Sequence, residues 1–415
     1  MAGVVFAVNS ALLLACLLGS PAPQAIGVWE VTLAGAIAFT VGLLVITRMT
    51  GAMTARFREQ LVPLLLLPAI GIPLIISAAV GLTAGVSLGA AVRASVPYAL
   101  FLPVILLGFI VGRRGSLWVI TIPLAIAGVL QSLYLLGLFV VTVPDLGDVR
   151  SVWVLRTTLL DPRTTLPLLL AAATLPLAWR ERSTKRVYRL LGWVPAGLAL
   201  AAALSTQTRS QVLAVLVGIG SYLVASGVMR LRASGKSWTT VGTRVGTRLA
   251  ASVVLALLLA LAFAPTRAMV LAVVLRSQSS LDTGRFSDEW EPAMDAVLSR
   301  GIPGVTAGIG AGESFVTAAG EERTYVHNLL LYGLVYFGGP GLGLILLGYL
   351  IVFLGLLRRG ARSGDMRFLA LAAMVAAMFV FAQFFAVHKL FSYNLMLALA
   401  AQALTQPPPA PRGAW

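Results

Sequence analysis

Residues 61–82 read LVPLLLLPAIGIPLIISAAVGL, without a charged side chain. An α-helix that crosses the hydrocarbon core of a bilayer needs about 20 apolar residues, and this run provides them. The whole chain has 415 residues, of which 59% are hydrophobic and 11% are charged. Soluble domains are roughly 45–50% apolar and about 25% charged. The composition therefore excludes a soluble globular protein and predicts an all-α, polytopic membrane protein.

Further apolar runs on both sides of this stretch predict about twelve transmembrane helices. We interpret residues 1–415 as a single membrane domain, and we expect the Pro-rich end, residues 405–415, to be a disordered cytoplasmic tail. The expected spans lie near residues 2–19, 27–47, 61–82, 92–112, 116–141, 164–179, 190–206, 211–229, 249–265, 328–357, 367–386 and 390–404.

Basic residues indicate which loops face the cytoplasm. Cytoplasmic loops carry an excess of Lys and Arg, so both termini are expected in the cytoplasm. This topology places the excess positive charge on one face and accounts for the net charge of +16. Nucleic acid is therefore not an expected partner. The basic clusters follow every second predicted span, at residues 48–58, 113–114, 180–189, 230–248 and 358–367.

The largest predicted outer loop comprises residues 264–327, between the ninth and tenth spans. Within it, residues 287–292 read SDEWEP, a typical helix start with acidic side chains at the positive end of the helix dipole. We expect a short helix lying on the membrane surface and ending at Gly301 and Pro303. The apolar face of this helix would comprise Trp290, Met294, Val297 and Leu298.

Two arginines and a histidine on the outer face are candidate functional residues. Arg209 lies in a polar stretch between two apolar spans, where its guanidinium group needs water or an anion, and a lipid phosphate would satisfy it. Arg285 precedes the loop helix and could instead pair with Asp282 or Asp288. His327 lies where the long loop re-enters the membrane, and its imidazole could accept a proton from a hydroxyl. A cap or a packing residue is the alternative role for this histidine.

Metal and nucleotide sites have weaker support. Glu289 and Glu291 have the acid-x-acid spacing of metal-dependent, lipid-linked glycosyltransferases, but acids at a helix start are the simpler explanation, and the first outer loop, residues 19–27, contains no acidic residue. Gly308, Gly310 and Gly312 follow no predicted strand and lie outside the cytoplasm, so they do not indicate a nucleotide site. We therefore expect neither a metal nor another cofactor.

Several short motifs together resemble the bacterial O-antigen ligase and polymerase superfamily. The first is Thr208-Arg209-Ser210 at the start of a span, and the second is Arg285 followed by Trp290 in the long loop. The resemblance covers residues 205–345 in motif and the whole chain in topology. The remaining motifs are Gly301-Ile302-Pro303-Gly304, Gly308-Ile309-Gly310, His327-Asn328 with Leu330, and the stretch from Gly338 to Leu342.

The resemblance implies an inverting, metal-independent glycosyltransferase in the bacterial inner membrane, with its active site facing the periplasm. Its donor would be a glycan on undecaprenyl pyrophosphate, and its acceptor would be the lipid A core or another glycan. Arg209 and Arg285 would bind the pyrophosphate, with Arg156 as a weaker third candidate, because guanidinium groups bind phosphate oxygens without a metal. His327 would be the catalytic base. Supporting residues would be Trp290, Asn328 and Arg93.

The acceptor distinguishes a ligase of lipopolysaccharide biosynthesis from a polymerase. Polymerases of this superfamily often have paired Arg-x10-Gly motifs in two outer loops. Arg209 and Gly220 match this spacing, but Gly220 lies inside a predicted span and no arginine of the long loop matches it, which favours a ligase. A lipid-linked glycan transporter is the alternative outside the enzymes. Transporters tend to have repeated halves and ionisable groups near the bilayer midplane, and this sequence shows neither.

Overall fold

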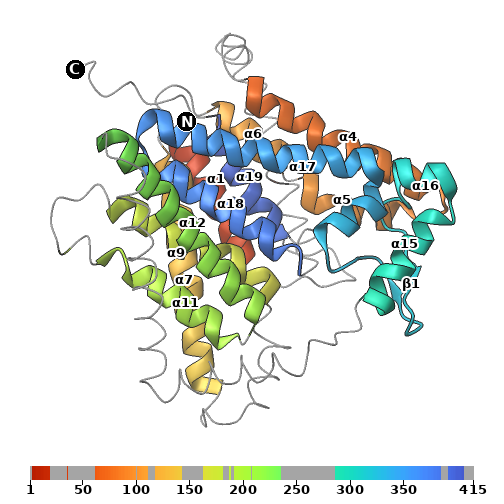
Figure 1. The fold of residues 1–415 in the computed structure, drawn as a ribbon, viewed down its shortest axis with the longest axis horizontal. Coiled ribbons are helices and arrows are strands. Elements are labelled where there is room, and N and C mark those ends of the chain that lie inside the picture. The colour runs from red at the N-terminus through yellow and green to blue at the C-terminus, as the bar shows by residue number, and fades with distance from the viewer. Residues whose placement is uncertain are drawn as a thin grey trace. The chain divides into compact units, whose positions relative to one another are not determined.

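The computed structural model describes residues 2–18, 35, 61–99, 101–110, 117–142, 162–180, 187, 191–206, 208–234, 286–384 and 391–405. These residues form thirteen α-helices, one π-helix and a hairpin of two short strands, so the fold is all-α as predicted (Figure 1). The chain divides into two compact units. The first comprises residues 1–123, 283–355 and 379–407, and the second comprises residues 124–282, 356–378 and 408–415.

The first unit contains the helices around the candidate site. In its N-terminal part these are α1 (Ala2–Leu18), α4 (Leu61–Thr83), α5 (Leu88–Ala99) and α6 (Phe101–Ile110). The described part of the long loop adds η1 (Phe286–Trp290), α15 (Glu291–Leu298), α16 (Gly301–Ala307), β1 (Phe315–Val316) and β2 (Glu322–Arg323). Most of α17 (Leu329–Ser363) and all of α19 (Phe391–Ala403) complete the unit. α19 packs against α1, α5 and α6, and the Asn9 amide donates a 3.0 Å hydrogen bond to Gln402 within this packing.

The second unit is formed by apolar helices. Its members are most of α7 (Trp118–Thr142), α9 (Pro162–Arg180), α11 (Val194–Ser205), α12 (Arg209–Ser234) and most of α18 (Met366–Phe381). α9 packs against both α11 and α12. Small side chains, among them Ala171, Ala172 and Ala199, are fully buried there and allow the helices to approach closely.

The helices agree in position with the predicted spans. Every predicted span overlaps a described helix except 27–47, of which only residue 35 is described, and 249–265, which lies outside the described residues. Four helical segments in the described part of the chain are long and apolar enough to cross a membrane: Leu65–Thr83, Trp118–Val141, Ser210–Leu231 and Leu329–Ser363. The number of twelve spans therefore stays a prediction.

Exposed apolar side chains follow helical spacing on these candidate spans. On α7 the exposed residues Ile126, Leu130 and Leu133 recur every three or four residues and so share one side of the helix. α17 repeats this pattern with Leu347, Leu350 and Leu354. Apolar surface of this extent is unfavourable in water and suits contact with lipid. The distribution supports a membrane protein.

The loop helix differs from the prediction at its end. The buried side chains of α15 are Ala293 and Val297, whereas Leu298, which the prediction places on the apolar face, is exposed. Gly301, with φ +61°, ends α15 as expected, but α16 begins there and includes Pro303. A proline is tolerated in the first turn because the amides there have no partner within the helix. Pro303 therefore starts a second helix instead of ending the first.

Glycines between residues 308 and 312 allow the backbone of the loop to contact the backbones of α4 and α17. The amide of Ile309 donates to the carbonyl of Val335 at 2.7 Å, and the amide of Ala311 donates to Ser77 of α4 at 2.8 Å. A Cβ atom at Gly310, where φ is +99°, would overlap the backbone of Gly81. These glycines therefore attach the loop to the ends of α4 and α17.

Replacing Gly310 with alanine is expected to destabilise the protein. The positive φ costs about 1–3 kcal/mol for a residue with a side chain, and the overlap with Gly81 adds to this because a backbone cannot rotate away. Gly343→Ala is the matched control, since Gly343 lies in α17 with no atom within 4 Å of the added methyl group. Thermal unfolding in lipid nanodiscs should give a lower midpoint for Gly310→Ala only. Equal midpoints for the two variants would contradict this role of Gly310.

Candidate functional site

A buried carboxylate and a histidine form the centre of the candidate site. Glu289 lies in η1 and its side chain is 1% exposed. One of its oxygens, Oε2, lies 2.7 Å from Nδ1 of His327, and the other, Oε1, accepts a hydrogen bond from the His327 backbone amide. Both carboxylate oxygens therefore hold one residue that is 38 positions away in the sequence. The His327 side chain remains 17% exposed.

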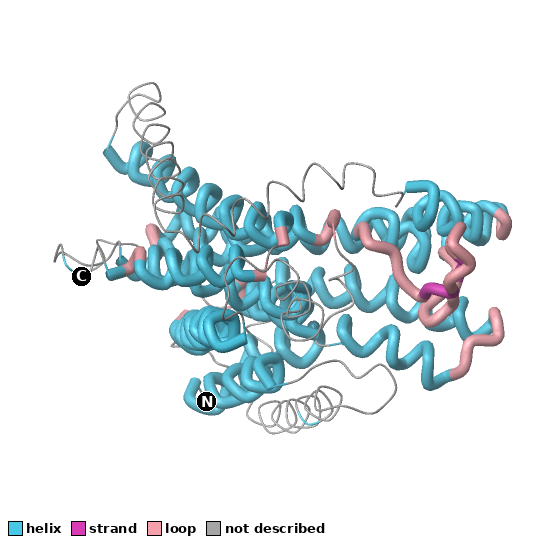
Figure 2. The backbone as a smooth tube through the Cα atoms, turned by 90° about the horizontal axis from the view of Figure 1, so that it is seen from below, coloured by secondary structure: helices cyan, strands magenta, loops and turns pink. Residues whose placement is uncertain are grey.

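A β-hairpin brings His327 back to η1. β1 and β2 are antiparallel, with Phe315 opposite Arg323 and Val316 opposite Glu322 (Figure 2). Asp288, which precedes Glu289, accepts hydrogen bonds from the amides of Ala318 and Ala319 in the hairpin turn, each at 3.0 Å. The turn is thus attached to η1, and the chain after β2 passes directly along Glu289.

Arg323 balances the charge of the buried carboxylate. Its Nη1 lies 3.2 Å from Oε2 of Glu289, and its Nη2 lies 2.6 Å from Oε2 of Glu321. The hydrogen bond to Glu321, whose side chain is exposed, raises the pKa of Arg323. A permanent cation beside Glu289 offsets the cost of burying a negative charge.

The electrostatics determine which nitrogen of His327 is protonated. Burial by itself raises the pKa of Glu289, but hydrogen bonds from His327 and the positive charges of His327 and Arg323 outweigh burial and lower the pKa. Glu289 is therefore ionised at neutral pH and can only accept hydrogen bonds. The proton of neutral His327 must then be on Nδ1, which leaves a lone pair on Nε2. This arrangement gives a general base with a defined tautomer.

Asn328 fixes the position of this histidine at the start of α17. Its Oδ1 accepts a 3.0 Å hydrogen bond from the Leu331 amide, as an N-cap residue does. Its Nδ2 donates at 3.2 Å to the carbonyl of Gln383, and the Leu329 amide donates to Ala382 at 2.9 Å. The cap is therefore Asn328 and not His327, which leaves the imidazole available for other contacts.

The predicted arginines are only partly described. Arg209 is the first residue of α12, in the second unit, and its side chain lies outside the described part of the structure. Arg285, Arg156 and the second histidine, His388, also lie outside the described residues. Arg93 is exposed on α5.

Buried polar side chains hold the turn that precedes α12. Thr206 donates a 2.7 Å hydrogen bond to the Gln211 side chain, and Gln211 donates at 2.9 Å to Thr165 of α9. All three side chains are buried. Because a buried polar group without a partner is costly, this network restrains the backbone at Arg209.

The other candidate residues occupy separate environments. Trp290 is half-buried and packs against a cluster that includes Ala293, Val297 and Phe315. Glu291 is exposed while Glu289 is buried and paired, so the two acids do not form one donor set. Among the described residues, no group of three or more His, Cys, Asp or Glu side chains could hold a metal ion.

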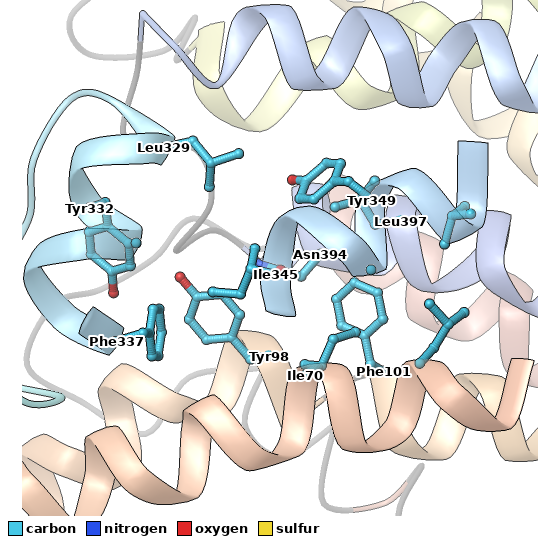
Figure 3. A pocket seen from close by; sticks show the side chains of 14 residues that line it. Ile70, Tyr98, Phe101, Leu329, Tyr332, Phe337, Ile345, Tyr349, Asn394 and Leu397 are labelled. Atoms are coloured by element: carbon cyan, nitrogen blue, oxygen red, sulfur yellow. The ribbon is translucent and has the colours of Figure 1, made fainter. Parts of the chain in front are cut away.

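An apolar cavity lies within the first unit. It is bounded by α4, α5, α6, α17 and α19, and one of its lining residues, Leu329, is two residues after His327. Figure 3 shows Tyr332 and Phe337 on one side of the cavity and Tyr349 and Asn394 on the other, with Tyr98 between them. α17 bends around the cavity because Gly338, at φ +69°, and Pro340 interrupt the helix.

Neither Arg323 nor the pairing of Glu289 with His327 was predicted from the sequence. The sequence from Phe315 to Val326 has β-branched and aromatic residues on both sides of a short stretch with Gly320, which is a hairpin signal. That signal could have predicted a turn before Arg323 and His327, but not their contact with Glu289. No model of a known protein family matches the chain, and no curated protein matches its sequence.

Acid is expected to destabilise the wild-type protein through Glu289. Because the pKa of Glu289 is lowered in the folded protein, the ionised carboxylate stabilises the fold above the unfolded value near 4.5, and this contribution disappears as the pH falls through the folded value. The thermal midpoint should therefore fall more steeply on acidification in the wild type than in Glu289→Gln. The exposed neighbour provides the control: Glu291→Gln should keep the wild-type slope. Identical slopes in all three proteins would show that Glu289 contributes nothing.

Proposed function

We propose that this chain is an O-antigen ligase-like glycosyltransferase. It moves a glycan from undecaprenyl pyrophosphate to a sugar hydroxyl of the lipid A core at the periplasmic face of the bacterial inner membrane. The observation that carries the proposal is the contact between Glu289 and His327 at the start of α17. An oriented imidazole can serve as the base for transfer to a hydroxyl, and Leu329, two residues later, lines an apolar cavity.

The proposed reaction is a single displacement. Nε2 of His327 takes the proton of the acceptor hydroxyl, and the acceptor oxygen forms a bond to the anomeric carbon of the donor sugar. The bond from that carbon to the pyrophosphate oxygen breaks, and the pyrophosphate leaves with the electron pair. Glu289 stabilises the imidazolium ion formed in this step, as a buried carboxylate does in hydrolytic triads. One displacement inverts the configuration at the anomeric carbon.

The arginines would stabilise the leaving group. Negative charge accumulates on the pyrophosphate as the bond breaks, and guanidinium groups bind phosphate oxygens through two parallel hydrogen bonds. We assign this role to Arg209 and Arg285, with Arg156 as a further candidate. No metal or other cofactor is needed for this stabilisation.

Sidedness supports the proposed location of the site. In the proposed topology of twelve spans with both termini in the cytoplasm, α4 ends and α17 begins on the periplasmic side. The glycine-rich segment after α16 contacts these two ends. The cavity beside Leu329 is apolar and could accept part of the isoprenoid chain of the donor.

Reconstituted protein can test the proposed function. Purified protein in nanodiscs should transfer glycan from undecaprenyl pyrophosphate to lipid A core, with an inverted linkage and with full activity in excess EDTA. Extension of a second lipid-linked glycan instead would identify a polymerase of the same superfamily. Movement of the donor across proteoliposomes without a new linkage would identify a transporter. Loss of transfer in EDTA and recovery with Mg²⁺ or Mn²⁺ would contradict the metal-independent mechanism.

A further inference from the structure

Residues 301–312 form an unusually apolar part of the long loop, which we call the apolar finger. Its sequence is GIPGVTAGIGAG, without a charged residue. It begins with α16, where Ile302 is 79% exposed and Val305 is 43% exposed. Leu298, just before the finger, is exposed as well. Isolated apolar side chains are common on soluble surfaces, but several together on a charge-free segment indicate a contact with another apolar phase.

Several polar groups of the finger have partners within the protein. The hydroxyl of Thr306 donates to the carbonyl of Ile302 in its own helix at 2.8 Å. At the base of the finger, Arg300 forms an ion pair with Glu313 at 3.3 Å and donates to the Ile309 carbonyl at 2.8 Å. Polar groups that enter a bilayer must have such internal partners. The finger thus has a charged pair at its base and no charge at its tip. This is the distribution expected of a segment that enters lipid from the membrane surface.

The finger is also continuous with the apolar surface of a candidate membrane span. α16 packs beside α4, and Gly310 approaches the backbone of Gly81 near the end of that helix (Figure 1). On the same part of α4, Ile75 is 70% exposed and Ile76 and Leu82 are also exposed. α4 is a candidate membrane span whose exposed side chains would face lipid. The surroundings of the finger would therefore be the lipid of the leaflet that contains the C-terminal end of α4.

We propose that the apolar finger inserts into the bilayer leaflet that contains the C-terminal end of α4. Its partner there is the acyl chain region of the lipid. Ile302 and Val305 would lie among the acyl chains. Arg300 and Glu313 would lie at the level of the lipid head groups. The chain continues from Glu313 into the hairpin, so this insertion also sets the height of Glu289 and His327 above the membrane. The proposal concerns membrane contact alone and does not depend on the glycan transfer reaction.

Spin labels can measure the depth of the finger. Cys16 is the only cysteine, so Cys16→Ala provides a background for single cysteines at Ile302, at Ile75 and at Ala318. Ala318 is exposed at the hairpin turn, away from the finger, and serves as the control for water. The full chain is labelled with a nitroxide in nanodiscs of phosphatidylethanolamine and phosphatidylglycerol. Collision rates are then measured with oxygen, which concentrates in lipid, and with a water-soluble nickel chelate.

The proposal predicts that Ile302 resembles Ile75. Both labels should collide more often with oxygen than with nickel, and the Ala318 label should show the opposite order. A nickel-accessible Ile302 label would overturn the proposal, because the finger would then lie in water. An immobile Ile302 label that is protected from both reagents would also overturn it, because a protein partner would then cover the finger.

Discussion

Replacing His327 with alanine is expected to slow glycan transfer by about 10²- to 10⁴-fold, the usual contribution of a positioned general base. Donor binding should persist, because the pyrophosphate contacts are assigned to arginines. Initial rates and donor binding, measured on both proteins at the same pH, would test both expectations.

A second histidine on the predicted outer face provides the control for this variant. His388 belongs to a short connection to which we assign no role in the reaction, so His388→Ala should transfer glycan at the wild-type rate. If His327→Ala retained the wild-type rate at normal expression, His327 would be only a residue at the start of α17. The arginines would then act through electrostatics and orientation alone.

Arg209→Ala and Arg285→Ala are each expected to lose about 10²- to 10³-fold in rate, the typical effect of removing one preorganised donor to a developing negative charge. Lysine at either position should restore little activity, because a single ammonium group lacks the planar pair of donors that matches a phosphate. Transfer rates and donor binding should be measured together for the alanine and lysine variants.

The control for these variants is a basic residue on the opposite face. Arg182 lies in a predicted cytoplasmic cluster, so Arg182→Ala should leave the rate unchanged. Wild-type rates for both Arg209→Ala and Arg285→Ala would show that the pyrophosphate is held by other groups.

The helical part of the fold could be predicted from the sequence. An apolar run such as residues 61–82 specifies a helix by length and composition, and α4 spans Leu61–Thr83. The start of the loop helices was also readable, because acids and a proline mark the first turn near Trp290. Among the described helices, length and hydropathy identify four candidate membrane spans, so the number of twelve spans stays a prediction.

The site required information that local patterns do not contain. Glu289 is a typical helix-start acid in sequence, and only the hairpin 26–34 residues later makes it a buried partner of His327. Each strand of that hairpin has two residues, too short for an alternating pattern to identify. Long-range contacts of this kind depend on the path of the chain and not on composition. Gly310 gives a second example, because its need for a positive φ becomes apparent only when Gly81 of α4 is placed beside it.

Transfer rates in a double-mutant cycle of His327→Ala and Glu289→Gln test the central claim most directly. Residues that act as one unit have non-additive effects. We predict that Glu289→Gln loses part of the roughly 10²- to 10⁴-fold contribution of the base, because the amide no longer enforces the Nδ1 proton, and that the double variant is no slower than His327→Ala alone. Thermal midpoints measured on the same samples separate this effect from unfolding. Multiplication of the two single effects, or a wild-type rate for His327→Ala, would contradict the account.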